Sequence, residues 1–397
     1  MSWAILDQGL TSISNLLLAL LVARSSAASV LGVLGVVLAY YTLGLVVARA
    51  ACGEPLLLVV ANRRDTSIAT CSAVSGATAL AGSALAVLSI LVALVVGGQL
   101  LPAMAVLALF MPGLMLQDTY RLWFFAAEQP AKATALDALW LALQTAFFAT
   151  LFALGRADLL PLLCAWGLAA GVAALWGWNM TRARIGVHAG FQYLKTFWPT
   201  SRLLAADAVL ALGPTQVALL LIGLLFSLDV AGSLRAGLVV LGPISVLAQS
   251  LSYSLIPVMR RRVIQHQSVT AASCSIAVAM ATVSCIWAFI ALLGPRWLQA
   301  VLGRALETSQ PVLVPLAVYF LLNSASIGPL LGLRAMLALK RALVVRLYLA
   351  PIAVVAPAVG AAAVGASGAA WGCALGGAAT LLGWTLGYAR ASRPAAA

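Results

Sequence analysis

The chain is built as a succession of apolar stretches, each long enough to cross a lipid bilayer. Of its 397 residues, 63% are hydrophobic and only 8% are charged, and the mean hydropathy is +1.07. About 20 apolar residues span a bilayer as a helix, and the lipid offers no water to unpaired backbone amides. We therefore predict an all-α integral membrane protein with twelve transmembrane helices. The predicted spans are Trp3–Ala23, Val30–Ala50, Cys71–Val96, Leu101–Phe125, Ala133–Leu154, Leu159–Trp178, Leu203–Phe226, Leu234–Val258, Val269–Leu293, Val312–Leu333, Leu343–Val364 and Gly368–Tyr388.

The cations are unevenly distributed over the connections between these spans. With a cytoplasmic N-terminus, five of the 23 Lys and Arg residues fall on the outer side and the other 18 on the inner side. The five are Arg24, Arg156, Arg235, Arg296 and Arg304. This asymmetry follows the positive-inside rule and predicts a multi-pass protein of the cell (plasma or inner) membrane with both termini in the cytoplasm. Topology then accounts for most of the net charge of +13, so no nucleic-acid partner is predicted.

Several features recur in the same order at an offset of about 200 residues, which indicates a duplicated bundle. The matching landmarks are Asp7 with Asp207, Gly32 with Gly232, Pro55 with Pro257, Arg63-Arg64 with Arg260–Arg262, and Arg121 with Arg334. We predict two six-helix lobes, residues 1–179 and 203–397, related as a parallel pseudo-repeat. Residues 180–202 would form a cytoplasmic linker between them.

The linker mixes cations with aromatic residues. Arg182, Arg184, Lys195 and Arg202 alternate with rings such as Trp198. Such a composition beside a membrane is typical of an interfacial segment on the cytoplasmic leaflet. A solvated loop that obeys the positive-inside rule explains it equally well, and both interpretations stay open.

Helix breakers fall inside several predicted spans. Gly213-Pro214, Gly242-Pro243 and Gly328-Pro329 lie in the second half of the chain, and Pro112-Gly113 lies in the first. Such residues bend helices and release carbonyl groups that can line a cavity. Together they favour a transporter over a passive anchor.

Polar residues inside the spans are the candidates for function, because a charge at membrane depth is costly and usually faces a cavity or a partner. Asp118 and Arg121 are three residues apart on one helix face and can pair. Asp137 and Gln144 also share a face. A structural alternative places Arg121 near the inner boundary, with its side chain reaching the lipid headgroups.

Enzyme signatures are missing from the sequence. It has no GxxxxGK[ST] nucleotide-binding loop and no Asp-x-Asp motif, and both of its histidines fall in predicted cytoplasmic loops. The six cysteines show no CxxC spacing. We therefore predict no enzyme activity, no catalytic residue, no cofactor and no metal site.

The pattern resembles the multidrug/oligosaccharidyl-lipid/polysaccharide (MOP) exporter superfamily, and within it the Wzx-type polysaccharide flippases. The stretches that carry the resemblance are Asp7-Gln8-Gly9-Leu10-Thr11-Ser12 with Asn15, the turn ending in Gly32, Gly53-Glu54-Pro55, Gln117-Asp118 with Arg121 and Asp137, and Gly242-Pro243. The family implies a MATE-like V of two lobes and alternating access that carries a lipid-linked glycan outward. The chain departs from the family in having few cations at depth, chiefly Arg121 and Arg235.

These considerations predict a secondary transporter that flips a polyprenyl-diphosphate-linked glycan to the outer leaflet, driven by a coupled proton or sodium ion. An ion-coupled multidrug or small-metabolite exporter of the same fold is the alternative. Besides the substrate and the coupling ion, membrane lipids are the expected partners. The candidate substrate-binding residues are Arg121, Arg235, Asp118, Gln117, Gln249 and Asn323. The candidate ion-coupling residues are Asp7, Asp207 and Asp137.

Overall fold

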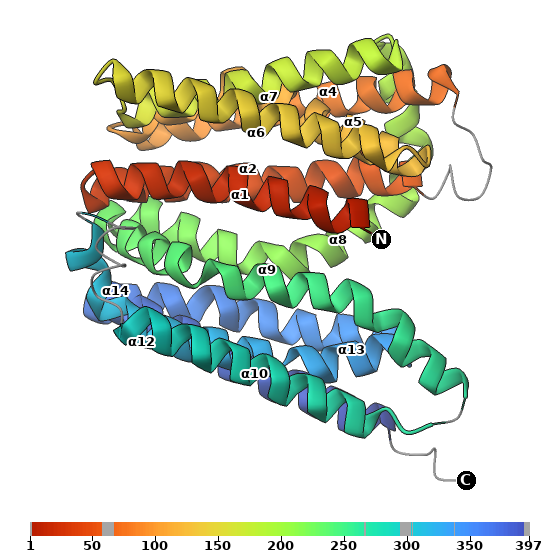
Figure 1. Cartoon of the computed structure of the whole chain (residues 1–397), viewed down its shortest axis with the longest axis vertical. Coiled ribbons are helices and arrows are strands. Elements are labelled where there is room, and N and C mark those ends of the chain that lie inside the picture. Colours follow the sequence, from red (N-terminus) through yellow and green to blue (C-terminus); the bar gives the residue numbers. More distant parts are fainter. Residues whose placement is uncertain are drawn as a thin grey trace. The chain divides into compact units, whose positions relative to one another are not determined.

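A computed structural model describes residues 2–57, 67–265, 267–293, 303, 305–336 and 338–392 (Figure 1). Every secondary-structure element in these ranges is a helix, and nine helices there are long and apolar enough to cross a membrane. The predicted all-α class is confirmed, whereas the count of twelve spans stays a prediction. The cations Arg63, Arg64, Arg296 and Arg304 lie outside the described residues.

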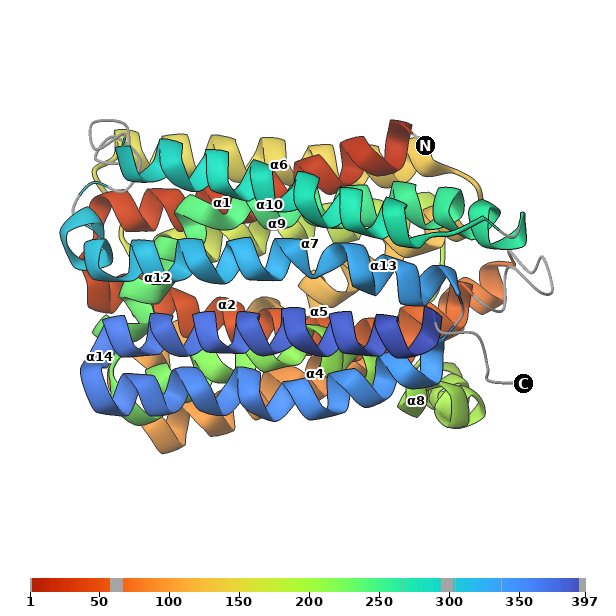
Figure 2. The same ribbon diagram turned by 90° about the horizontal axis from the view of Figure 1, so that it is seen from below.

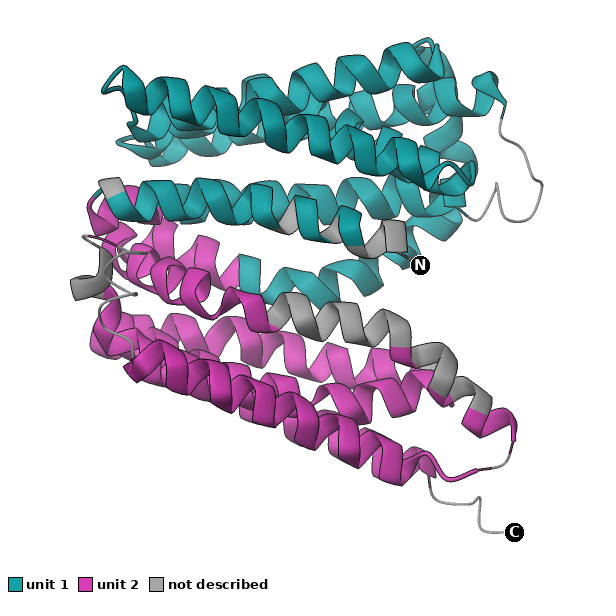
Figure 3. Cartoon of the chain, in the orientation of Figure 1, with its two compact units in different colours: residues 1–26, 33–216 teal, residues 27–32, 217–397 magenta. Residues whose placement is uncertain are grey.

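The chain separates into two compact units (Figure 3). Unit 1 comprises residues 1–26 and 33–216, and unit 2 comprises residues 27–32 and 217–397. The last change from unit 1 to unit 2, between residues 216 and 217, therefore falls within a single long helix, α8.

Unit 1 is a helical bundle in which α5 is central. Its elements are α1 (Ser2–Ser25), most of α2 (Ala28–Ala48), the π-helix η1 (Arg49–Gly53), α4 (Ile68–Val96), α5 (Leu100–Ala126), α6 (Pro130–Ala153), α7 (Leu159–Thr181) and most of α8 (Val187–Leu221). Helix α5 packs against α4, α6 and α7, and α1 packs against α6. Large buried side chains such as Tyr120, Phe124 and Trp166 fill this core.

Local sequence sets the helix ends in unit 1. The Ser67 hydroxyl caps α4 by accepting a hydrogen bond from the Thr70 amide at 3.3 Å. At the other end, Gly97 and Gly98 have φ values of +69° and +58°. Glycine adopts this left-handed region without a steric penalty, so the chain can reverse there and begin α5.

Unit 2 is a second helical bundle, built around α9 and α12. Its elements are η2 (Ile222–Phe226), α9 (Leu228–Ile264), α10 (Thr270–Leu293), α12 (Ala305–Ala325), α13 (Ile327–Ala335) and α14 (Leu339–Ser392). The predicted span Val312–Leu333 is divided between α12 and α13, directly before Gly328-Pro329. A helix break is thus present near this pair, whereas α8 and α9 continue as helices through Gly213-Pro214 and Gly242-Pro243.

The long element α14 is a helical hairpin. Its backbone leaves the helical conformation at Val364 and Gly365, and Figure 2 shows its two runs side by side. Small residues allow this approach, because a Cβ added at Gly360 or Gly372 would collide with the backbone of the opposite run. The division corresponds to the two predicted spans on either side of residue 365.

A repeat landmark explains one close helix contact inside unit 2. A Cβ on Gly32 would run into the carbonyl oxygen of Leu228, and one on Gly232 would run into that of Ala28. The starts of α2 and α9 therefore cross at the two glycines that the sequence analysis pairs as landmarks of a predicted repeat. Only glycine permits this approach, because any side chain would displace a backbone.

Many helices expose apolar side chains outward, as a protein in lipid must. On α4, the exposed fractions of Val87, Leu91, Leu94 and Val95 range from 53% to 87%. Such a surface would aggregate in water but is matched to acyl chains.

Candidate functional site

A buried cluster of charged side chains lies in unit 1, with Arg121 of α5 at its centre. The Arg121 Nη1 donates to Asp7 Oδ2 of α1 at 2.9 Å, and its Nη2 donates to Asp118 Oδ1 at 2.9 Å. Asp137 Oδ2 of α6 lies 3.7 Å from the same Nη1. Only 8% of the Arg121 side chain is exposed. Three carboxylates thus converge on one guanidinium.

A second arginine enters the cluster from the π-helix η1. Arg49 Nε donates to Asp118 Oδ2 at 2.6 Å and Arg49 Nη2 donates to Asp118 Oδ1 at 2.6 Å, which is a bidentate pair. Asp118 therefore bridges two arginines. In the sequence, Arg49 is one of the 18 cations counted on the inner side, because it stands at the end of an apolar stretch where cations are common. Its approach to α5 depends on packing between helices that are far apart in the chain.

Amides fix the orientation of the acidic groups on α6. Gln117 Nε2 donates to Asp137 Oδ1 at 2.7 Å. Two turns further along α6, the Ser14 hydroxyl donates to Gln144 Oε1, and Gln144 Nε2 donates to the Ser14 carbonyl at 2.8 Å. The face that Asp137 and Gln144 were predicted to share therefore lies against α1 and α5. No motif or spacing in the sequence marked Ser14 as a partner of Gln144.

The cluster contains three carboxyl groups and two guanidinium groups. With all five ionised it carries one net negative charge, which a buried site tolerates poorly. One proton, or one monovalent cation held by the carboxylates, would make it neutral. The arrangement can therefore bind and release a single positive charge.

Aromatic rings adjoin the cluster within the bundle. Tyr41 of α2 meets Trp166 of α7 edge to face, with ring centroids 5.0 Å apart. Trp140 of α6 lies 6.0 Å from Trp166 and donates from Nε1 to the Trp166 carbonyl at 3.3 Å. All three side chains are buried.

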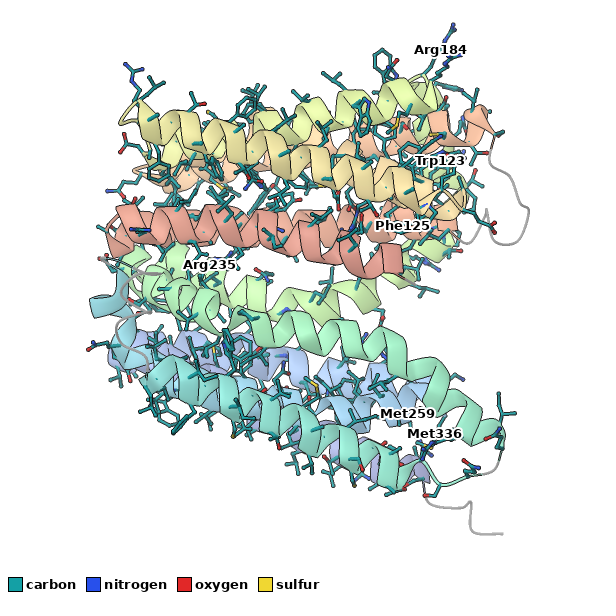
Figure 4. All side chains as sticks on the ribbon, in the orientation of Figure 1. Trp123, Phe125, Arg184, Arg235, Met259 and Met336 are labelled. Atoms are coloured by element: carbon teal, nitrogen blue, oxygen red, sulfur yellow. The ribbon has the colours of Figure 1, made fainter. Side chains whose placement is uncertain are left out.

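Arg235 occupies a different environment, on α9 in unit 2 (Figure 4). It lies roughly two turns after the first residue of that helix, and its side chain is largely buried. Its Nε is buried and has no hydrogen-bond partner in the part of the chain that the structure describes. No carboxylate of the described residues forms an ion pair with it. Arg235 is therefore a half-buried cation with a buried, unpaired Nε and no ion pair to any acidic residue that the structure describes.

The remaining candidates are spread over other elements. Asp207 is exposed on α8, with Glu54 as a charged neighbour. Asn323 is half-buried near the end of α12, and its carbonyl accepts from the Ser326 hydroxyl at 2.6 Å. The side chain of Gln249 lies outside what the structure describes. The structure thus brings together Asp7, Gln117, Asp118, Arg121 and Asp137 from the predicted set, and it places Arg235 in the other unit.

Comparison with known proteins identifies the fold. No protein-family model matches the sequence, and no curated protein matches it. Similar solved structures include an inward-facing multidrug resistance MATE family transporter of the MOP superfamily, with 15% identity, coverage of 97% of this chain and 94% of that chain, and a TM-score of 0.69. The lipid II flippase MurJ in an inward closed conformation has 10% identity, 98% and 90% coverage and a TM-score of 0.64. A MATE protein in a bent conformation has 12% identity, 98% and 93% coverage and a TM-score of 0.57. The chain has the fold of MOP-superfamily transporters, so the predicted resemblance is confirmed at the level of fold.

Proposed function

We propose that this chain, which has a MOP-type fold, is a secondary transporter that flips a lipid-linked oligosaccharide or polysaccharide precursor from the cytoplasmic to the outer leaflet. Alternating access would move the substrate. In this proposal the chain has twelve spans, lobes of residues 1–179 and 203–397 joined by the linker 180–202, and both termini in the cytoplasm. The similarity in fold to a lipid II flippase supports this class of substrate.

The observation that carries the proposal is the lone cation at Arg235. A half-buried guanidinium whose Nε is buried and unpaired, with no acidic partner among the described residues, is costly in an apolar span, and it is expected where an anion binds. A diphosphate matches it, because arginine binds phosphate oxygens through two parallel hydrogen bonds. The polyprenyl tail could stay in the bilayer while Arg235 holds the charged head.

The cluster around Arg121 takes the second role, coupling to an ion. Its guanidinium already contacts Asp7, Asp118 and, at a longer distance, Asp137, so little of it is left for a substrate phosphate. We therefore move Gln117, Asp118 and Arg121 from the substrate group to the coupling group. The excess of one carboxyl suits the uptake of a proton or a sodium ion.

An ion-coupled exporter of drugs or small metabolites is the second candidate. The acid-rich cluster and the similarity to multidrug MATE transporters favour it. In that case Arg235 would not determine which substrate is carried.

Transport by the purified chain in proteoliposomes distinguishes the two. The first substrate is a fluorescent polyprenyl-diphosphate-linked sugar, whose arrival in the second leaflet is read by a membrane-impermeant quencher. The second is a fluorescent lipophilic cation. We expect ion-gradient-dependent movement of the lipid-linked sugar and none of the cation. Movement of the cation alone would reject the flippase and support the exporter.

A further inference from the structure

The first turns of α8 differ in direction from the helices around them. Figures 1 and 2 show this segment running crosswise to α4–α7 at one end of the unit 1 bundle. Gly190 lies so close to α4 that a Cβ on it would collide with the backbone at Gly76. The basic and aromatic sequence of residues 182–202 is therefore an ordered helix docked across the bundle end, together with the turn that precedes it, and not a loose loop.

Helical spacing divides residues 187–202 of α8 into three stripes. The stripe that faces the protein contains Gly190, Tyr193, Phe197 and Ser201, which are buried or half-buried. The polar stripe contains His188, Gln192 and Thr196, all exposed. The third stripe, which we call the basic-aromatic stripe, contains Val187, Phe191, Lys195, Trp198 and Arg202, and all five are exposed.

The basic-aromatic stripe combines two kinds of contact with a membrane surface. Val187, Phe191 and Trp198 are 64%, 60% and 60% exposed, which is costly in water for large apolar groups. Lys195 and Arg202 lie between and beside them on the same stripe. A helix with one face on the protein, one polar face and one basic apolar face is suited to lie in the headgroup layer.

The charged residues of the segment itself are all of one sign. Arg184, in the turn before α8, points away from the ribbon in Figure 4, and Arg182 is also exposed. The sequence has no acidic residue between Asp158 and Asp207. The segment therefore attracts anions without internal neutralisation, as anionic lipid headgroups require.

The buried stripe links this surface to the charged cluster. The Tyr193 hydroxyl donates to the Cys52 carbonyl at 3.0 Å, and the Ser201 hydroxyl donates to the Ala51 carbonyl at 3.0 Å. Both carbonyls belong to η1, the π-helix whose first residue, Arg49, pairs with Asp118. Single π-helical turns inside α-helical segments frequently occur at functional sites, where they reposition a side chain.

We propose that residues 182–202 bind the phosphate headgroups of anionic phospholipids, and that this binding steadies η1 and thereby the Arg49–Asp118 pair. Lipid phosphates lie along the segment against Arg184, Lys195 and Arg202, and the adjoining acyl regions lie against Phe191 and Trp198. This proposal concerns regulation of the cluster and does not depend on which substrate is carried.

The first experiment measures lipid binding to the full chain by native mass spectrometry, with phosphatidylglycerol titrated against phosphatidylcholine. The variant Arg184→Gln/Lys195→Gln/Arg202→Gln removes three cations. Each contributes about fivefold to affinity, so we expect phosphatidylglycerol to bind on the order of 100-fold more weakly. The control Arg24→Gln/Arg156→Gln/Lys340→Gln removes three exposed cations elsewhere and should bind as the wild type does.

An unchanged Kd in the first variant, or an equal loss in the control, would overturn the lipid site. The Tm of each variant without added lipid verifies that it is folded.

The second experiment tests the link to η1 by hydrogen exchange at residues 47–54 in nanodiscs with and without phosphatidylglycerol. In the wild type the lipid should slow exchange there. The variant Tyr193→Phe/Ser201→Ala keeps the basic-aromatic stripe, so it should bind phosphatidylglycerol normally but show no slowing. Equal slowing in this variant and the wild type would overturn the link.

Discussion

The arginines in the interiors of the two units differ in whether acidic side chains pair with them. In unit 1, Arg121 and Arg49 share three carboxylates, and every pairing contact between these charges is 3.7 Å or less. In unit 2, Arg235 has a buried Nε without a partner among the described residues. A paired network of charges keeps its own geometry and can respond to one added charge. A cation without an acidic partner among the described residues is instead suited to an anion that the protein binds. This contrast is the basis of our proposal that the first region couples to an ion and that the second binds an anion.

The largest expected effect comes from breaking the network at its centre. Arg121→Ala would leave three buried carboxyls facing Arg49 alone. Breaking a buried ion pair by removing one partner costs roughly 3–5 kcal/mol, so we expect a clear loss of folded protein in the membrane. Thermal unfolding in detergent and membrane abundance measure this.

The matched control is Arg156→Ala, which removes an exposed arginine of the same unit and should change neither quantity. Wild-type stability in Arg121→Ala would show that the network does not depend on its central charge.

Removing the lone cation should separate activity from stability. Arg235→Met keeps the length and apolar stem of the side chain and takes away an unpaired charge, so we expect the Tm to be unchanged or higher. Transport should fall by at least about 30-fold, because truncating a buried charge partner costs 2–5 kcal/mol of binding. Arg235→Lys should recover part of the activity, since it keeps the charge and loses the planar fork. A fall in Tm with normal transport would make Arg235 a structural residue.

The excess carboxyl in unit 1 can be tested without dismantling the network. Asp7→Asn keeps the shape of the side chain and makes the remaining two carboxyls match the two guanidiniums. We expect normal abundance, transport lowered roughly tenfold and a weaker response of transport to an imposed ion gradient. Asp207→Asn, at the repeat-related but exposed position on α8, should have the smaller effect. If the two variants behave alike, the cluster has no special part in coupling.

The smallest effect is expected at the edge of the network. Ser14→Ala removes the hydroxyl that donates to Gln144, and hydrogen bonds between membrane helices average about 0.6 kcal/mol. The expected change is a small decrease in Tm with transport retained. Thr145→Ala is the control, because the Thr145 hydroxyl is exposed and bonds only within its own helix, to the Leu141 carbonyl at 2.7 Å. A large loss from Ser14→Ala would extend the functional cluster along α1.

The helices and the pairs of residues close together in the chain could be predicted from the sequence. Apolar length predicted spanning helices, and the three-residue spacing of Asp118 and Arg121 predicted the pair that the structure contains at 2.9 Å. The glycines at 32 and 232 were visible as repeat landmarks. The helices and the Asp118–Arg121 pair depend on residues that are close together in the chain, and the two glycines depend on a pattern that recurs along it.

Pairs of residues that are far apart in the chain could not be predicted from the sequence. Arg49 and Asp118 are 69 residues apart and meet because η1 packs against α5. No spacing rule connects such positions, and an arginine at a helix end looks like an ordinary topological cation. For the same reason the sequence grouped Arg121 with Arg235 as phosphate ligands. Only the surrounding carboxylates distinguish their environments.

The central claim is that Arg235, and not Arg121, meets the anionic head of the substrate. The most direct measurement is equilibrium binding of a short-chain polyprenyl-diphosphate-linked sugar to the purified full chain in nanodiscs. The wild type is compared with Arg235→Met, Arg235→Lys and the surface control Arg156→Ala. We predict a Kd at least about 30-fold weaker for Arg235→Met, an intermediate value for Arg235→Lys and no change for the control. An Arg235→Met variant that binds the diphosphate as tightly as the wild type would contradict the account.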